Sequence, residues 1–269
     1  MKVFDLFPFY NELDLLELRI AELDSVVDVF GLVELPVTFT DRPKPLYYAE
    51  MRLRVDVDHP KVNFYVPPAY PSGLHPTVDW FQRAQLGKHL SGAWDGDIVM
   101  VSDVDEIPNR DVVRRIIAAG IDEPLCLQSR LYYHRVDLYD ESGPWSGTII
   151  CTVKQFHEAG GAQELRHRRC LLPQIPDAGW HFSWLGNEKA IAEKLLAVDI
   201  ERDSNDQMTN PGQNLDFLRS CYETGTDLFG RKEHNKVRVP IIPGVNQPHE
   251  VEAWLSKYPQ YGAMDTVPY

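Results

Sequence analysis

The sequence predicts an α/β protein with a mostly parallel central sheet flanked by helices and a second half in which strands run in both directions. Residues 3–35 show a strand, a helix and a strand in succession. Residues 98–101 are apolar at every position, which is typical of a strand buried on both faces in a helix-covered parallel sheet. The length of 269 residues with 43% hydrophobic side chains fits one domain, residues 1–269, with halves 1–120 and 121–269.

The first half begins with a βαβ unit. Residues 3–7 form the expected first strand, and a helix over 12–23 places its leucines on one face. Asn11 can cap that helix, and residues 26–35 form the second strand. The pattern then predicts a strand at 62–66 between proline- and aromatic-rich loops within 36–77, a helix at 78–90, the strand at 98–101 and a helix at 111–119 closed by Gly120.

The second half has a looser pattern. Two strands, 125–138 and 148–156, are expected around a loop at 140–147. The remaining features are a basic stretch at 166–169, an aromatic strand at 179–184, helices at 187–198 and near 213–222, a strand at 237–242 and a helix at 249–257. Strands without regular crossovers predict mixed pairing.

Composition excludes some functions. The chain has 27 basic and 40 acidic side chains, a net charge of −13, so we expect no nucleic-acid partner. The four cysteines form no C-x-x-C pair, which argues against a zinc knuckle or a disulfide framework. No stretch approaches the ~20 apolar residues of a membrane span. We therefore expect a soluble, cytoplasmic chain, with peripheral membrane contact left open and the oligomeric state undetermined.

Three acidic side chains, Asp103, Asp105 and Glu106, directly follow the buried strand at 98–101. Ligand sites of open α/β sheets gather at the carboxyl ends of strands. Carboxylates this close repel one another unless a cation neutralises them, and Mg²⁺ or Mn²⁺ prefers such oxygen ligands. The alternative is a helix start with solvated acids. Two other D-x-D motifs, 56–58 and 95–97, lie in a charged stretch and at a glycine turn.

A D-x-D motif at a strand end, followed by aromatic loops, indicates a glycosyltransferase that uses a sugar nucleotide. A metal that bridges the diphosphate stabilises the negative charge that develops on the leaving group. Aromatic loops suit stacking against sugar faces.

Five sequence blocks, in order, resemble glycosyltransferase family 17. They are Phe9–Arg19, Val33-Glu34 with Thr38–Thr40 and Lys44-Pro45, Gln82-Arg83, Ser102–Pro108 and Gly179–Trp184. The resemblance covers most of the chain. It implies a GT-A-like (Rossmann-like) fold, a UDP-sugar donor such as UDP-GlcNAc, a glycan or glycoconjugate acceptor, inversion at the anomeric carbon, and Mn²⁺ or Mg²⁺. Residues 1–120 would then be the nucleotide-sugar half and 121–269 the acceptor half.

The resemblance also implies a metal site. Asp103 and Asp105 would hold the metal and the donor ribose or diphosphate, and His181 would complete the metal shell. An imidazole ligand favours Mn²⁺ over Mg²⁺. The alternative for His181 is a core histidine packed between Trp180 and Phe182.

The donor contacts follow from the same blocks. Asn11 and Glu12 would lie at the nucleotide base, and Glu34 would face base or ribose hydroxyls. Helix capping by Asn11 and a dipole interaction of Glu12 are the alternatives. Lys44 and Arg83 would meet the diphosphate, with ordinary salt bridges as the alternative.

An inverting transfer needs a general base that takes the proton of the acceptor hydroxyl. The candidates are Glu158 and Asp206, and Glu158 is favoured because it follows an expected strand and precedes glycines. Both residues are equally explained as solvated acids. Animal members of the family have a membrane anchor, which this sequence does not show, so it resembles a bacterial or viral relative with a lipid-linked or surface-polysaccharide acceptor.

Two rival functions remain. A nucleotidyltransferase that makes sugar nucleotides would need a glycine-rich loop after the first strand, and residues 7–12 contain no glycine. A non-catalytic carbohydrate-binding protein would keep the aromatic loops without needing the acidic motif. The presence of Asp103, Asp105 and His181 argues against it.

Overall fold

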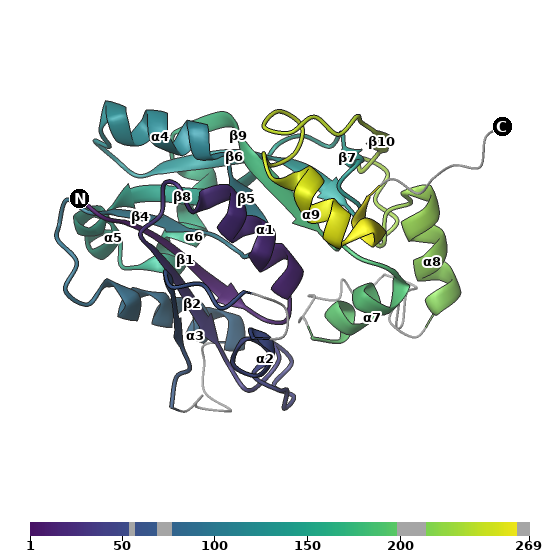
Figure 1. Cartoon of the computed structure of the whole chain (residues 1–269), viewed down its shortest axis with the longest axis horizontal. Coiled ribbons are helices and arrows are strands. Elements are labelled where there is room, and N and C mark those ends of the chain that lie inside the picture. The colour runs from purple at the N-terminus through teal and green to yellow at the C-terminus, as the bar shows by residue number, and fades with distance from the viewer. Residues whose placement is uncertain (54–56, 69–76, 198–213, 263–269) are drawn as a thin grey trace.

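The computed structural model describes residues 1–53, 57–68, 77–197 and 214–262 (Figure 1). Within them, ten strands form one sheet in the order β10-β7-β6-β8-β4-β1-β2-β3, and β9 pairs with β5 and β6. The strands are β1 (Val3–Phe9), β2 (Val29–Glu34), β3 (Val62–Tyr65), β4 (Ile98–Val101), β5 (Glu106–Pro108), β6 (Leu125–Tyr133), β7 (Leu138–Asp140), β8 (Trp145–Thr152), β9 (Gln174–Ser183) and β10 (Lys236–Arg238).

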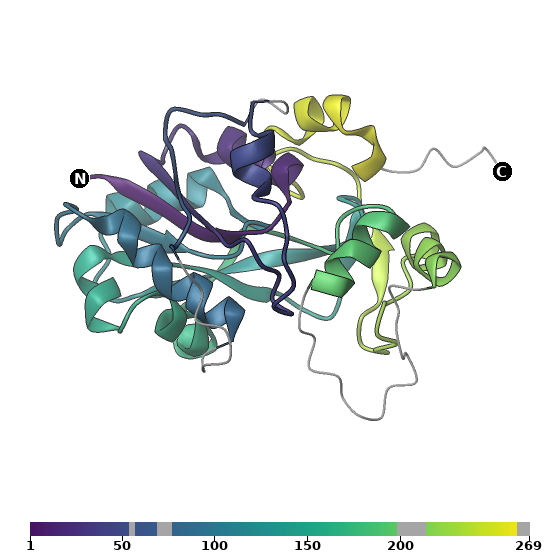
Figure 2. The same cartoon turned by 90° about the horizontal axis from the view of Figure 1, so that it is seen from below.

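Helices lie on both faces of this sheet (Figures 1 and 2). They are α1 (Leu13–Leu23), α2 (Tyr47–Met51), α3 (Val78–Ala84), α4 (Arg110–Ala119), α5 (Val153–Glu158), α6 (Ala162–Arg168), α7 (Glu188–Ala197), α8 (Leu215–Thr224) and α9 (Val251–Lys257). A 3₁₀ helix at Gln85–Leu90 continues α3. The predicted α/β class is therefore confirmed.

The first half contains the parallel part of the sheet. Strand β1 lies between β2 and β4, β3 pairs with β2, and all these pairs are parallel. Every residue of β1 and β4 is buried, as the apolar run predicts. Phe7 packs with α1 and α4 on one face, whereas Leu6 packs with α5, α6 and the 3₁₀ helix on the other. Burial on both faces explains why this segment lacks polar alternation.

The second half is mixed, as predicted. Strand β8 runs antiparallel to both β4 and β6, while β6 and β9 are parallel. Trp180 and Phe182 of β9 pack with α1 and α9 in a third core, and both are almost fully buried. Helix α9 near the C-terminal end therefore packs in the same core as α1, the first helix of the chain.

Several expected boundaries were wrong, including those of the strands at 125–138 and 237–242, which end at Tyr133 and Arg238. The loop region 36–77 contains the short helix α2. The strand expected at 148–156 ends at Thr152, because a reciprocal capping box between Thr152 and Gln155 starts α5 there. Helix α1 begins after Glu12 with no side-chain cap, so Asn11 does not cap it.

The acidic segment after β4 is held by a buried arginine from α1. The guanidinium of Arg19 forms two bonds of 2.7 and 2.6 Å with Asp5. It also donates to the Ser102 hydroxyl at 2.6 Å and to the carbonyls of Asp103 and Glu106 at 2.9 and 2.7 Å. Because β5 then pairs with β9, this segment is not a helix start with solvated acids. No helix in the described part of the chain is long and apolar enough to cross a membrane.

Candidate functional site

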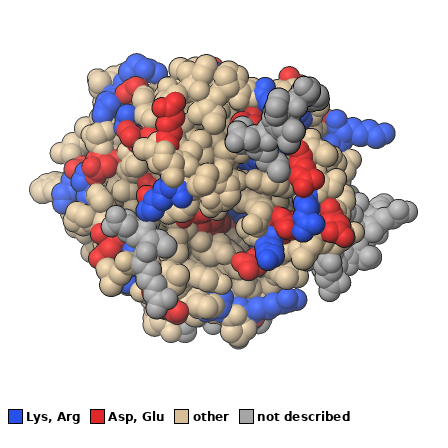
Figure 3. Space-filling view, turned by 45° about the vertical axis from the view of Figure 1, so that its right-hand side comes forward, with Lys and Arg blue, Asp and Glu red and all other residues tan. Residues whose placement is uncertain are grey.

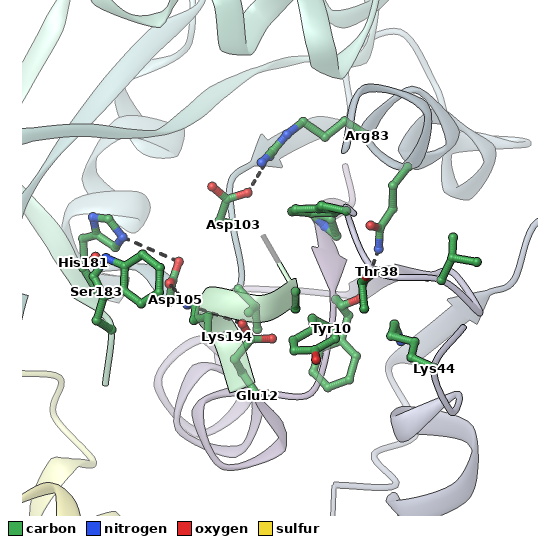
Figure 4. Close-up of a pocket in the computed structure, with 18 residues that line it drawn as sticks. Tyr10, Glu12, Thr38, Lys44, Arg83, Asp103, Asp105, His181, Ser183 and Lys194 are labelled. Carbon is green, nitrogen blue, oxygen red and sulfur yellow. Dashed lines mark hydrogen bonds and ion pairs between the residues drawn. The ribbon is translucent and has the colours of Figure 1, made fainter. Parts of the chain in front are cut away.

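A pocket of about 200 Å³ lies where β1 and β4 end. This is the position that open α/β sheets use for ligands. The loops after β1 and β2, helix α3, the segment between β4 and β5, the end of β9 and helix α7 all contribute to it (Figure 4). Its lining residues are Pro8, Phe9, Tyr10, Glu12, Val37, Thr38, Phe39, Lys44, Gln82, Arg83, Asp103, Val104, Asp105, His181, Ser183, Trp184, Lys194 and Ala197.

The carboxylate of Asp103 is held between two arginines. Its Oδ1 lies 2.5 Å from Nη1 of Arg83, and its Oδ2 lies 2.6 Å from Nη2 of Arg166. Burial opposes ionisation of Asp103, but the guanidinium groups of Arg166 and Arg83 outweigh it, so its pKa is lowered. Arg166 also pairs with the buried Glu106 at 2.8 Å. Asp103 is thus part of a closed ionic network.

The carboxylate of Asp105 has a different environment, although it is only two residues away. Its Oδ2 accepts from Nζ of Lys194 at 3.0 Å, and its Oδ1 lies 3.6 Å from Nε2 of His181. Lys194 also lies 3.5 Å from Glu12 (Figure 4). Burial would raise the pKa of Asp105, but Lys194 and His181 more than compensate and lower it. These longer contacts leave room for exchange of partners.

His181 faces the pocket and not the core. Alternation along β9 sends Trp180 and Phe182 into the third core, whereas His181 lines the pocket. Its ring lies 4.7 Å from the ring of Trp145 between centroids, and its Nδ1 has no hydrogen-bond partner among the described residues. The core-histidine alternative is therefore wrong.

Asp105 and His181 present a carboxylate oxygen and an imidazole nitrogen 3.6 Å apart at the pocket wall, and both are donor types that Mn²⁺ accepts. No group of three or more His, Cys, Asp or Glu side chains in the described segments could hold a metal ion. Both oxygens of Asp103 point at arginines. The three predicted metal ligands thus do not form one group, and Asp103 stands apart.

Two predicted donor contacts have other partners. The fully buried carboxylate of Glu34 accepts from Nζ of Lys44 at 2.9 Å and from the backbone N–H groups of Tyr47 and Tyr48 at 2.6 and 3.1 Å. Glu34 does not line the pocket, because these bonds hold it at the start of α2. Lys44 does line it, but the rings of Tyr10 and Tyr47 cover its ammonium at 5.4 and 5.1 Å.

The other predicted residues divide as follows. Glu12 and Arg83 line the pocket, whereas Asn11 does not. Glu158 ends helix α5, not a strand, with its side chain 62% exposed and 3.7 Å from Lys154. It does not line the pocket, and the position directly after a strand that favoured it is not observed, so its role as general base stays a prediction. Asp206 lies outside the described residues.

Three important residues were missed. Arg166 belongs to the basic stretch 166–169, but nothing in that stretch distinguishes it from Arg168, which is exposed. Lys194 lies on α7, far along the chain from its partners. Tyr10 follows the first strand, where burial raises the pKa of its hydroxyl to about 12. Of the three residues, only Tyr10 could have been found from the sequence, because it lies in the block Phe9–Arg19 that resembles glycosyltransferase family 17.

The fold and the pocket define an α/β protein with a pocket where parallel strands end, lined by paired acids and a histidine. Sugar-nucleotide transferases belong to this class. The family model of glycosyltransferase family 17 matches residues 1–199, and the chain belongs to that family.

The rat and human β-1,4-mannosyl-glycoprotein 4-β-N-acetylglucosaminyltransferases are each 26% identical to this chain over 265 residues. These alignments cover 83% of the chain but 47% and 48% of the relatives, so the chain spans about half of their length. Among solved structures, glucosyl-3-phosphoglycerate synthase of Mycobacterium tuberculosis aligns with a TM-score of 0.38 and 13% identity, covering 93% of this chain and 92% of that one. The cytidylyltransferase IspD of Francisella tularensis aligns with 0.39 and 9%, covering 66% and 91%.

Proposed function

We propose that this protein is a metal-dependent inverting glycosyltransferase that moves N-acetylglucosamine from UDP-GlcNAc to a hydroxyl group of a glycan or glycoconjugate. Membership of family 17 supports glycosyl transfer. The printed names of the mammalian relatives support N-acetylglucosamine as the sugar. The facing pair of Asp105 and His181 at the end of β4 is the single structural observation on which the proposal depends.

Asp105 and His181 would hold the divalent cation, and the mixed oxygen and nitrogen donors favour Mn²⁺. When bound, the cation neutralises the charge that grows on the diphosphate leaving group. Asp103 then acts indirectly. By binding Arg83 and Arg166 it fixes two guanidinium groups beside the site, where Arg83 reaches the pocket.

The aromatic end of the pocket suits the nucleoside. Tyr10 lines it and is braced edge-on by Tyr47, with ring centroids 5.7 Å apart. A base stacked on such a ring gains about 1–3 kcal/mol. Glu34 contributes by fixing Lys44 beneath these rings and not by touching the donor.

The transfer itself is a displacement at the anomeric carbon. The acceptor oxygen forms its bond from the face opposite the diphosphate, the bond from carbon to phosphate oxygen breaks, and a base takes the hydroxyl proton. Asp206 stays a prediction for that base, because it lies outside the described residues.

Calorimetry with UDP, GDP and CDP, each with and without Mn²⁺, tests the proposal. UDP should bind in the presence of Mn²⁺ and lose at least about tenfold in affinity without it, which corresponds to ~1.4 kcal/mol. His181→Ala should remove this dependence, whereas His157→Ala, at an exposed histidine on α5, should not.

Slow release of free N-acetylglucosamine from UDP-GlcNAc would then separate a transferase from a carbohydrate-binding protein. Formation of UDP-GlcNAc from the sugar phosphate and UTP would instead identify a nucleotidyltransferase. Equal UDP binding with and without Mn²⁺ would contradict metal dependence.

A further inference from the structure

The charged side chains of the pocket are balanced before any ligand enters. Three carboxylates line it, those of Glu12, Asp103 and Asp105, and so do the cations of Lys44, Arg83 and Lys194. Acidic and basic side chains are likewise interspersed on the face shown in Figure 3. A divalent cation alone therefore enters a site whose carboxylates already have partners.

Two of the three cations are paired with carboxylates other than Asp105. Arg83 pairs with Asp103 and Asp79, and Lys44 pairs with Glu34. Lys194 differs, because its ammonium bonds directly to Asp105 at 3.0 Å and reaches Glu12 at 3.5 Å. Lys194 is therefore the pocket cation that directly neutralises Asp105.

The ammonium of Lys194 also has an alternative partner in the pocket. Its side chain is 23% exposed and belongs to α7, which joins the loop after β2 through a hydrogen bond of 3.2 Å from the Thr40 hydroxyl to the Leu196 carbonyl. The long, flexible lysine side chain can change partners without movement of the helix. Glu12 at 3.5 Å keeps it at the pocket when Asp105 is taken.

We propose that Lys194 couples metal binding to donor binding. With neither ligand bound, its ammonium is the counter-ion of Asp105 and competes with the divalent cation. When the cation binds Asp105 and His181 together with a diphosphate, the ammonium moves from Asp105 to the diphosphate oxygens. The cation and the diphosphate of a UDP-sugar have opposite charges, so they enter a balanced pocket together more favourably than either enters alone.

This inference rests on the proposed metal-dependent function and adds a reciprocal coupling to it. By linkage, the factor by which UDP strengthens Mn²⁺ binding equals the factor by which Mn²⁺ strengthens UDP binding. A lysine that only fastened α7 to the pocket would give no such coupling. Removal of such a lysine would weaken the binding of both Mn²⁺ and UDP, or of neither.

The test measures the affinity for Mn²⁺ alone, from the paramagnetic resonance signal of free Mn²⁺, without UDP and with saturating UDP. In Lys194→Met, Mn²⁺ alone should bind at least about tenfold more tightly than in the wild type, because the variant lacks the ammonium that competes with the cation at Asp105. The strengthening by UDP should fall by a similar factor. The affinity for Mn²⁺ alone thus rises in the variant, whereas the strengthening of Mn²⁺ binding by UDP falls.

Lys189→Met is the matched control, because Lys189 lies on the same helix and is exposed. It removes the same charge from α7 and should leave both measurements within about twofold of the wild type, since exposed charges are largely screened. Lys194→Gln is the second variant, which keeps a hydrogen-bond donor, and should shift Mn²⁺ affinity in the same direction as Lys194→Met.

The outcomes separate the two proposals. Unchanged or weaker binding of Mn²⁺ alone in both Lys194 variants, with the coupling intact, overturns the role of Lys194 and leaves the proposed function standing. A wild type that binds no Mn²⁺ even with UDP overturns the proposed function, and the inference with it.

Discussion

Asp103 and Asp105 belong to one motif but have opposite environments. Asp103 has contacts of 2.5 and 2.6 Å with two arginines that are themselves held by other acids. Asp105 has contacts of 3.0 and 3.6 Å with a lysine and a histidine. A closed network resists substitution, whereas a loose one can exchange partners. The comparison teaches that two acids of one D-x-D motif can differ in environment, one paired with two arginines and the other with a lysine and a histidine of the pocket.

The largest expected effect breaks the network of Asp103. Arg166→Met leaves Asp103 and the fully buried Glu106 without their shared cation. Loss of one partner from a buried ionic group costs about 3–5 kcal/mol. We expect the free energy of unfolding, measured by urea denaturation, to fall by that amount. Arg168→Met on the same helix, at an exposed residue, should cost less than about 1 kcal/mol, and an equal loss in both variants would contradict the network.

The next effect separates the two aspartates directly. Asp105→Asn should weaken UDP binding in the presence of Mn²⁺ by at least about a hundredfold, equivalent to ~2.7 kcal/mol, because the cation loses its carboxylate. Its unfolding free energy should fall by less than that of Asp103→Asn, because Asp105 has one hydrogen bond of ordinary length to a lysine and one longer contact with His181. Asp103→Asn should show the reverse, with a large loss of stability. Calorimetry measures the UDP affinity of both variants, and urea denaturation measures their free energies of unfolding. Equal changes in both quantities for the two variants would contradict the difference between Asp103 and Asp105.

Acid titration sharpens the comparison, because the pKa values of both aspartates are lowered and both remain ionised above pH 5. Burial lowers the pKa of His89 and of His134 to about 4 each. The unfolded chain, with a histidine pKa of about 6.5, therefore binds more protons between these values. Stability is full above pH 6.5 and is lost as pH falls towards 4, by about 2 kcal/mol for each histidine at pH 5.

Replacement of one of these histidines checks this assignment. His134→Asn should roughly halve the loss of unfolding free energy between pH 7 and pH 5. Asparagine tolerates the left-handed backbone of residue 134, where φ is 64°. The exposed His157→Asn should leave the pH slope unchanged. An undiminished slope in His134→Asn would trace the acid sensitivity to groups other than this histidine.

The smallest effect concerns Glu158. It lies on α5 with an exposed side chain, so Glu158→Gln should leave the rate of sugar release from UDP-GlcNAc within about twofold of the wild type. A loss of a hundredfold or more would show that Glu158 reaches the reacting hydroxyl after all. It would also add Glu158 to Asp103 and Asp105 as an acidic residue of the site.

Local patterns predicted much of the fold. The apolar run at 98–101 gave β4 with its bounds unchanged, and the amphipathic helix of the opening unit was placed within one residue. The capping box at Thr152 marks one exception, because two side-chain bonds begin a helix at residues 153–156, where the strand was expected to continue. The short α2 depends on Glu34, a distant residue that binds its first backbone N–H groups.

The site was only partly predictable, for a physical reason. Carboxylates that directly follow an apolar strand are visible in the sequence, so Asp103 and Asp105 were predicted together. Their counter-ions come from α3, α6 and α7, and a sequence does not show which of several arginines or lysines the chain brings back. The roles of the two aspartates depend on those partners. The motif could therefore predict where the site lies, but not that its two aspartates have different environments.

Arg19 has a consequence for rebuilding this protein. Its guanidinium joins the first strand, through Asp5, to the carbonyls of residues 103 and 106 that turn the chain after β4. Grafting the acidic turn onto a related scaffold without its matching first helix would leave those carbonyls unanchored. Successful chimaeras should exchange residues 1–23 and 98–108 as one cassette, and breakpoints between them should yield insoluble or inactive hybrids.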